Sequence, residues 1–552
     1  MIEQSRPLRM SENRTDNPAL DWTAYAACRL IEFLRGVKAT VKSLFSVRAI
    51  RLLRSPQIAE YCAYNGTLFS SKTNDREKMV LMDCTVIPQW LFVNSFFTNS
   101  LADRLDASVV TYGTSRRDLL ADGLFKSFGC SRHLIVSLTK TQRTERRKRF
   151  EEILMSVNTK RDLFELKLEG VWIGMDIYES ILRSGVPTVD VAAFRSKYFI
   201  FNALSYHIFF MDLFRSARVS AVSLSHDCYI SMGLVSRIAY RFDVPVYFSE
   251  SSSFTKTTHT HQLYERFRRF PSYFNSLTSA EKESGVEWAK KQLERRLSGV
   301  VGVNMSYQEK SAFASSRVPT QTTASEKTKI VVATHCFFDN PHCYGGMLFL
   351  DFYEWLCYLG EISEITDYEW FLKPHPDYLP GTLETLTRVS KLYPKLRLID
   401  PATSFHQLRH EGVSVALTCY GSIGHELPLL GYKVVNAGYN PHIAYKFNWH
   451  AETLEHYREL LLNLPELGDV AELEKIYEFY YISHVFDRPS DFLFESLAAY
   501  TADAGRDVLG PPAFGAFLKQ KEIFRDKANK RIAEFLDADS TYSAEQRIAS
   551  NC

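Results

Sequence analysis

Residues 413–436 read VSVALTCYGSIGHELPLLGYKVVN and combine two short apolar runs with a Gly/Ser loop between them. The pattern predicts strands over Val413–Thr418 and Lys433–Asn436, with a helix over Gly424–Leu430. Two strands joined through a helix form the unit from which parallel sheets are built. This stretch therefore predicts an open α/β sheet, whose ligands bind beyond the carboxyl ends of the strands.

The same alternation of strands and helices extends upstream of this unit. Further strands are predicted over Lys329–Ala333, Glu369–Leu372 and Leu396–Ile399, and helices over Met347–Leu359, Leu383–Leu392 and Phe405–Arg409. Repeated strand–helix units of this kind are typical of a Rossmann-like domain. We assign this domain to residues 327–450.

A second set of alternating elements occupies the first half of the chain. Strands are predicted over Met79–Val86, Ser108–Tyr112, Val219–Leu224 and Val244–Phe248, with helices over Trp90–Leu105 and Gly233–Tyr240 and helical patterns from Lys140 to Leu166. We assign residues 56–310 to this α/β domain. The segment 311–326, SAFASSRVPTQTTASE, has no periodicity and is interpreted as the linker, and 451–552 as a helical extension that frays after Lys527.

The length and composition narrow the class of protein. A chain of 552 residues with 45% apolar residues suits two folded domains. The net charge of +2 gives no global reason to expect a nucleic-acid partner. Ten cysteines without a CxxC pair favour a reducing compartment, and no stretch predicts export or a membrane span. We therefore expect a cytoplasmic protein.

The N-terminal segment, residues 1–55, is basic. Between residues 22 and 54 seven Lys and Arg residues accompany the single acid Glu32, and apolar residues recur at helical spacing. An amphipathic basic helix either packs on its own domain with a solvated charged face or attaches to an anionic membrane surface. Both interpretations stay open from the sequence.

The Gly/Ser loop carries the strongest candidate binding residues. A loop between a strand and a helix directs backbone N–H groups at an anion, and Ser422 adds a hydroxyl donor. Gly421 and Gly424 allow close backbone approach, and Glu426 on the first helical turn can accept from two ribose hydroxyls. Gly-Ser loops also cap helices without any ligand, so the pattern alone does not decide.

A second loop, Lys373-Pro-His375-Pro-Asp377, follows the strand Glu369–Leu372 and leaves the same sheet edge. Its two prolines restrict the backbone and hold the loop extended. Lys373 and His375 are therefore predicted to lie near Ser422 and to bind a diphosphate or a leaving nucleotide monophosphate. The alternative is a stiff turn with a solvated lysine.

A third loop on this edge spans residues 334–346 and contains two His-Cys pairs. Adjacent ligands on an extended chain point apart and the spacing fits no common zinc pattern, so we expect no metal here. The loop is predicted to close over a ligand bound at this edge, with Asp339, His342 and the Gly345-Gly346 turn facing it. A purely structural loop is the alternative.

Lys373–Asp377 followed by Gly421–Glu426 resembles the KPHP and Gly-Ser/Glu signatures of bacterial capsule and surface-carbohydrate glycosyltransferases. The resemblance is strongest over residues 329–445, and Val171–Tyr178 with Leu182-Arg183 is similar to an N-domain stretch of that group. It implies a GT-B fold, in which two Rossmann-like domains face a cleft, with helical additions at both ends of the chain.

The resemblance also implies a function and roles for the residues. A nucleotide-sugar donor would bind through His375 and Ser422 to its phosphate and through Glu426 to its ribose, without a cofactor or metal. CMP-, UDP- and GDP-sugars all stay open as donors, because the double-serine motif of polysialyltransferases is missing around Thr418–Gly421. The acceptor would be an oligosaccharide or a lipid-linked glycan. A metal-dependent, single-domain (GT-A) transferase would need a DxD motif after a central strand. The one match, Asp537-Ala-Asp539, lies in the predicted frayed tail instead.

The catalytic base is expected from the first domain, across the cleft from the donor. His226 and Asp227 follow the strand Val219–Leu224 and are the candidates, with Asp83 a weaker one. The alternatives are a helix cap by Asp227 and a buried, hydrogen-bonded His226.

Other functions share these features. They are a nucleotide-sugar 2-epimerase, a polyol-phosphate transferase and a non-catalytic glycan-assembly binding protein. About 150 residues beyond the epimerase length and the basic N-terminal segment favour a transferase.

Overall fold

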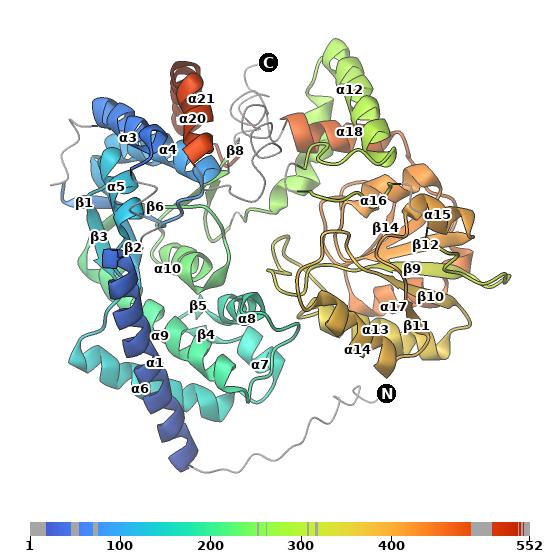
Figure 1. The fold of residues 1–552 in the computed structure, drawn as a ribbon, viewed down its shortest axis with the longest axis horizontal. Coiled ribbons are helices and arrows are strands. Elements are labelled where there is room, and N and C mark those ends of the chain that lie inside the picture. Colours follow the sequence, from blue (N-terminus) through green and yellow to red (C-terminus); the bar gives the residue numbers. More distant parts are fainter. Residues whose placement is uncertain are drawn as a thin grey trace.

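The structure is a computed structural model in which two α/β halves lie side by side (Figure 1). It describes residues 18–45, 54–69, 76–250, 253–260, 262–305, 308–314, 318–486, 511–538, 540–542 and 545.

The second half is built on a six-stranded, fully parallel sheet in the order β11-β10-β9-β12-β13-β14. Its strands are β9 (Lys329–Ala333), β10 (Glu369–Lys373), β11 (Leu396–Leu398), β12 (Val413–Thr418), β13 (Lys433–Ala437) and β14 (Trp449–Ala451). Its helices are α13 (Phe352–Ile365), α14 (Thr382–Leu392), α15 (Phe405–His410), α16 (Ile423–Glu426), η3 (Leu427–Leu430), α17 (Leu454–Leu462) and η4 (Leu464–Glu466).

The first half contains a sheet in the order β3-β2-β1-β6-β7-β8, parallel except for the edge strand β8. Its strands are β1 (Lys78–Met82), β2 (Ala107–Gly113), β3 (Arg132–Ile135), β6 (Arg218–Leu224), β7 (Val246–Glu250) and β8 (Ser253–Thr257). The associated elements are α3 (Pro56–Phe69), α4 (Pro88–Leu105), α5 (Leu119–Ser127), α6 (Lys140–Ser156), α7 (Lys160–Phe164), the hairpin β4 (Lys167–Leu168) and β5 (Val171–Trp172), α8 (Gly174–Arg183), α9 (Phe194–Ser216), the π-helix η1 (Tyr229–Gly233) and α10 (Leu234–Arg241).

Both faces of the first sheet are covered by helices, which explains its apolar strands. In β1, Met79 and Leu81 belong to the core under α6 and α9, whereas Val80 and Met82 face α3 and α4. A strand buried on both faces reads as a continuous apolar run.

The strand order in each sheet reverses once, between the first strand and the fourth, as in the Rossmann fold. Two such domains with helical additions at both ends constitute the predicted GT-B-like fold class, which is confirmed.

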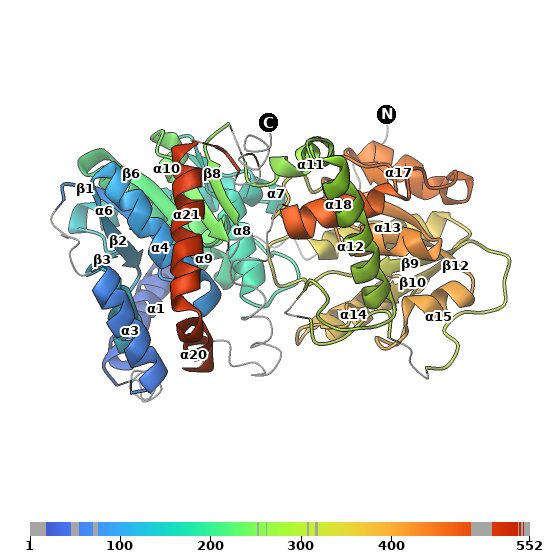
Figure 2. The same ribbon diagram turned by 90° about the horizontal axis from the view of Figure 1, so that it is seen from above.

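A helical cap covers the second domain beside its sheet. It consists of η2 (Glu265–Arg269), α11 (Phe270–Asn275), α12 (Ser279–Leu297), α18 (Lys475–Tyr481) and the π-helix η5 (Ile482–Phe486), which share one apolar cluster. Figure 2 shows α12 and α18 together on this half. The predicted first domain, 56–310, thus contributes α11 and α12 to the second half.

The segment predicted as a linker, 311–326, also packs on the second domain. Phe313 is buried with Val331 and Phe371, and the backbone N–H groups of Gln321 and Thr322 donate to Glu411. A stretch without periodicity can therefore still be held by its neighbours. Residues 315–317 lie outside the described residues.

The two ends of the chain both pack on the first domain. The basic segment forms α1 (Pro18–Phe45), which contacts α6 and α9; Arg48 and Arg51 lie outside the described residues. At the other end, α20 (Pro511–Lys519) and α21 (Lys521–Asp537) pack against α3 and α4 (Figure 2). The predicted extension 451–552 is thus divided between the domains, and its helix continues ten residues past Lys527. Asp539 lies outside the described residues.

Substitution of Phe524 on α21 tests whether this helix belongs to the first domain's core. Its ring contacts Phe96 and Phe517 and is 4% exposed. Phe524→Ala should lower the free energy of unfolding by about 3–5 kcal/mol. The neighbouring Ile523 is 61% exposed, so Ile523→Ala should change it by less than about 0.5 kcal/mol. Urea unfolding of both variants is the measurement, and equal midpoints would contradict the packing.

Candidate functional site

A cavity of about 950 Å³ opens at the carboxyl ends of β9, β10 and β12. Four parts of the chain line it. The first domain contributes Trp90, Ser225 and His226; the helical cap contributes Arg266, Phe267, Trp288, Gln292, Arg295, Arg296, Phe479, Ser483 and His484; the stretch 300–313 contributes several side chains, among them Asn304 and Gln308; the second domain contributes the loops after β9, β10 and β12 with Phe405, Pro441 and His442. The cavity thus lies where the sheet order reverses, the position at which open α/β sheets bind ligands.

His335, two residues after the end of β9, holds the Gly/Ser loop in place. Its Nε2 accepts from the backbone N–H of Cys419 at 3.2 Å and lies 2.8 Å from the hydroxyl of Thr418. The N–H of Gly421 in turn donates to that hydroxyl at 3.0 Å. Burial lowers the pKa of His335 to about 3, so the ring is neutral. Apart from its place in one of the two His-Cys pairs, nothing in the sequence marks His335 for this role.

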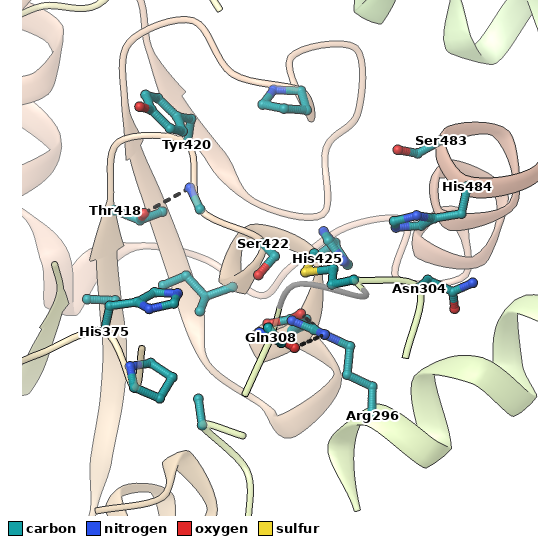
Figure 3. Close-up of a pocket in the computed structure, with 18 of the residues that line it drawn as sticks. Arg296, Asn304, Gln308, His375, Thr418, Tyr420, Ser422, His425, Ser483 and His484 are labelled. Carbon is teal, nitrogen blue, oxygen red and sulfur yellow. Dashed lines mark hydrogen bonds and ion pairs between the residues drawn. The ribbon is translucent and has the colours of Figure 1, made fainter. Parts of the chain in front are cut away.

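Ser422 lies in the cavity wall, and its hydroxyl has no hydrogen-bond partner among the described residues. In Figure 3 it lies between His375 and His425. The helix that follows is shorter than predicted, because α16 has four residues before Pro428 converts it to the 3₁₀ turn η3. Ser422 itself is therefore the loop's clearest free donor.

Gly421 and Gly424 serve different purposes. A Cβ at Gly421 would lie 2.9 Å from the Thr418 hydroxyl, within the loop's own hydrogen bonds. A Cβ at Gly424 would lie 2.5 Å from the His442 ring, which packs on this glycine. The close approach at Gly424 is thus to a buried histidine of the protein, and Gly424 is not among the described residues that line the cavity.

The Lys373–Asp377 loop brings two nitrogen donors to the cavity. His375 is exposed at the cavity, and its Nδ1 accepts from the N–H of Asp377 at 3.1 Å, which leaves the proton on Nε2. The surrounding protein lowers its pKa by desolvation. Lys373 is buried, with Nζ 3.2 Å from the carbonyl of Pro401, and burial lowers its pKa to about 8.

Glu426 is buried in the wall and forms an ion pair with Arg296 of α12. Arg296 also donates from Nη1 to Gln308 at 2.8 Å (Figure 3). The carboxylate predicted to accept from a ribose is thus occupied by an arginine. This pair fastens the helical cap to the Gly/Ser loop.

Asp339 and His342 do not line the cavity but join the two domains. Asp339 accepts from the hydroxyl of Tyr229 at 2.6 Å and lies 3.7 Å from Arg183. Buried His342 has its Nδ1 3.3 Å from Glu179 of α8. Their loop thus connects the second domain to the first.

Asp351, at the end of the same connection, extends this contact. It is buried at the N-terminus of α13 and accepts from the hydroxyls of Tyr178 and Thr188 in the first domain. Lys160 lies 3.7 Å from it. Side chains from both domains therefore hold their relative orientation beside the cavity.

His226 faces the cavity from the first domain, as the sequence predicts. Its Nδ1 lies 3.0 Å from the hydroxyl of Ser225 and its ring packs against Trp90, with centroids 5.1 Å apart. Asp83 accepts from the backbone N–H groups of Thr85 and Ser225 at 2.8 and 2.6 Å. The Asp83 carboxylate thus fixes the loop that presents His226.

Asp227 lies behind this wall and is not among the cavity-lining residues. It accepts from the hydroxyl of Ser236 at 2.6 Å and lies 3.6 Å from Arg237, which also faces buried Asp176. Burial raises the pKa of Asp227. This environment suits the helix-capping alternative better than contact with a substrate.

The helical cap supplies cavity residues that the motifs did not reveal. Arg266, Arg295 and Arg296 come from η2 and α12, together with the aromatic rings of Phe267 and Trp288. These three arginines and Lys373 bring four cationic side chains to the cavity. Glu426 is the one carboxylate among the described residues that line it. The cavity therefore favours an anionic ligand. The sequence signals for these residues are the arginine-rich stretch Glu265–Arg269 and the pair Arg295-Arg296.

The described residues contain no group of three or more His, Cys, Asp or Glu side chains placed to hold a metal ion. No helix among them has the length and apolarity needed to cross a membrane.

Comparison with known proteins gives similarities of fold at low identity. No protein-family model matches the chain, and no curated protein matches its sequence. Among solved structures, KpsC of Thermosulfurimonas dismutans, a beta Kdo 2,4 transferase, is 13% identical over 48% of this chain and 79% of that one, with a TM-score of 0.29.

Two other solved structures are similar over a larger share of this chain. UDP-GlcNAc 2-epimerase of Neisseria meningitidis bound to UDP-GlcNAc is 11% identical, covering 74% of this chain and 96% of that one, with a TM-score of 0.21. The MnaA–UDP structure from S. aureus is also 11% identical, covering 74% and 91%, with a TM-score of 0.23. The fold is assigned from the strand order of the two sheets and not from these TM-scores.

Proposed function

We propose that the protein is a glycosyltransferase that moves a sugar from a nucleotide-sugar donor to an oligosaccharide or a lipid-linked glycan at the membrane surface. The observation that carries the proposal is the composition of the cavity. One wall presents a hydroxyl and nitrogen donors from strand ends of the second domain, and the opposite wall presents His226 of the first.

The donor would bind on the second domain. The free hydroxyl of Ser422, the Nε2–H of His375 and the ammonium of Lys373 converge on the same edge of the sheet, as phosphate oxygens require. They would stabilise the charge that develops on the departing nucleotide. Glu426, paired with Arg296, would hold a ribose only together with that arginine.

The acceptor would approach along the first domain. When Nδ1 of His226 donates its proton to Ser225, the lone pair of Nε2 is available to a substrate hydroxyl. The acceptor oxygen would then bond to the sugar's anomeric carbon while the bond to the nucleotide phosphate breaks. Its proton passes to His226, and the electron pair leaves with the nucleotide. Asp227 would position η1 and α10 rather than react.

Incubation with labelled CMP-, UDP- and GDP-sugars tests the proposal directly. A transferase needs a glycan acceptor to convert the sugar into a larger product. Conversion of the nucleotide sugar to its 2-epimer without any acceptor would instead identify an epimerase. Binding of nucleotides without either reaction would favour a non-catalytic assembly protein. Transfer of a polyol phosphate from a CDP-polyol to a glycan acceptor, in a separate incubation, would favour the polyol-phosphate transferase.

Donor binding should depend on His375 and Ser422. His375→Ala and Ser422→Ala should each weaken the binding of the preferred nucleotide by about 10- to 100-fold, because each removes a hydrogen bond to a charged group. Thermal-shift titration with CMP, CDP, UDP and GDP measures this, since a ligand of the folded state raises its stability. His410→Ala, exposed on α15 outside the cavity, is the control. Unchanged binding in both site variants would overturn the assignment.

Donor binding should also weaken with rising pH through Lys373. Its pKa of about 8 in the free protein means that a bound phosphate must draw a proton onto the amine above that pH. Affinity for a nucleoside diphosphate should fall about tenfold between pH 7 and 9, whereas His375, with its lowered pKa, stays neutral over this range.

Calorimetric titration at several pH values measures this dependence. Lys373→Met should bind weakly and show a flat profile over the same range. The exposed Lys391 on α14 provides the control Lys391→Met, which should keep the parent's slope. A parent affinity that does not change with pH would contradict the assigned role.

His226 should control turnover without affecting donor affinity. His226→Ala should lower the transfer rate by about 10²- to 10⁴-fold, the usual contribution of a general base, with an unchanged nucleotide Kd. The transfer rate and nucleotide Kd of His226→Ala are compared with those of two variants outside the cavity lining. These are Asp227→Asn, behind the wall, and His259→Ala, on an exposed loop. Full activity of His226→Ala would place the base elsewhere.

A further inference from the structure

Helix α1 presents an apolar stripe to solvent. Leu30, Phe33, Leu34 and Val37 are 58%, 67%, 54% and 46% exposed. They recur at i, i+3, i+4 and i+7, which places them on one face of a helix. Exposed large apolar residues elsewhere in the described chain are spread over several elements. This concentration on one short stretch is the feature that needs an explanation.

The opposite face of α1 already packs on the first domain. Ala24 and Cys28 are buried in its core, and Tyr25 contacts Phe150 of α6 and Phe201 of α9. The helix is therefore anchored without its apolar stripe. Figure 1 shows α1 lying along α6 and α9.

Charged groups border the stripe on both sides. At about 100° per residue, Arg29 and Lys38 fall on its two edges. Glu32, the one acidic residue between 22 and 59, pairs with Arg29 and with Arg146 of α6 on the packed side. The outward face is thus apolar in the centre, with exposed Lys38 at one border and Arg29, which pairs with Glu32, at the other. Apolar side chains flanked by Lys and Arg are the arrangement of helices that lie in the interface of anionic membranes.

We propose that the outward face of α1, made of Leu30, Phe33, Leu34 and Val37 with Lys38 and Arg29 at its edges, docks the protein onto an anionic lipid bilayer. The apolar side chains enter the boundary between headgroups and acyl chains, and the cations remain with the phosphates. The inference depends on α1 alone and not on the proposed transferase activity.

Vesicle sedimentation of the full chain tests the surface. The probes are vesicles of phosphatidylcholine alone and of phosphatidylcholine with phosphatidylglycerol. The parent should sediment with the anionic vesicles, and Phe33→Glu combined with Leu34→Glu should remove this binding. The matched control is Met155→Glu combined with Ile365→Glu, which adds the same charge at side chains that are 67% and 59% exposed elsewhere; it should bind as the parent does.

The charge contribution is measured separately. Lys38→Ala should reduce partitioning about fivefold at low salt, and added salt should reduce the difference. Binding of the Phe33/Leu34 variant equal to the parent, or equal partitioning of the parent onto both vesicle types, would overturn the proposal. So would concentration-dependent self-association of the parent, lost in the Phe33/Leu34 variant, in sedimentation velocity without lipid, because a second copy would then be the occupant. Circular dichroism and urea midpoints of the variants exclude loss of the fold.

Discussion

The reversal of strand order between β9 and β12 is the constraint on which the rest of the site depends. Strands on either side of a reversal send their following connections to opposite faces of the sheet, so a gap remains beyond their carboxyl ends. His335 bridges this gap by accepting from the N–H of Cys419 and contacting the hydroxyl of Thr418. Because burial keeps its ring neutral, His335 can accept without adding charge. The Gly/Ser loop then keeps its shape with the hydroxyl of Ser422 unused.

The sequence predicts best those elements whose packing follows from their own residues. β9 and β12 match their predicted ends because apolar runs such as KIVVA are stable only when buried on both faces. The helices α12 and α21 are different, since their sequences are polar and only a few buried positions fix where they pack. Whether α12 joins the first or second domain depends on Phe479 and Tyr480, far along the chain. No local pattern contains that information.

The same distinction holds for the candidate site. Lys373, His375, Gly421 and Ser422 line the cavity because each ends or follows a strand of one parallel sheet, and strand ends are predictable. Asp339 and His342 sit further along a loop whose path depends on contacts with the first domain. Arg296 contacts Glu426 across 130 positions of sequence. Only the folded chain reveals that pairing.

The segment that connects β9 to α13 makes contacts that fix the two walls of the cavity relative to each other. Asp351 accepts from Tyr178 and Thr188 inside a buried interface, where a carboxylate is stable only if it is fully hydrogen-bonded. The same connection begins at His335, which shapes the Gly/Ser loop. A rotation of the first domain would therefore either break buried polar contacts or move this connection with it. His226 is carried by the first domain and Ser422 by the second, so their separation is set by these few side chains. Chemistry that requires both walls is consequently sensitive to residues such as Tyr178, which does not line the cavity.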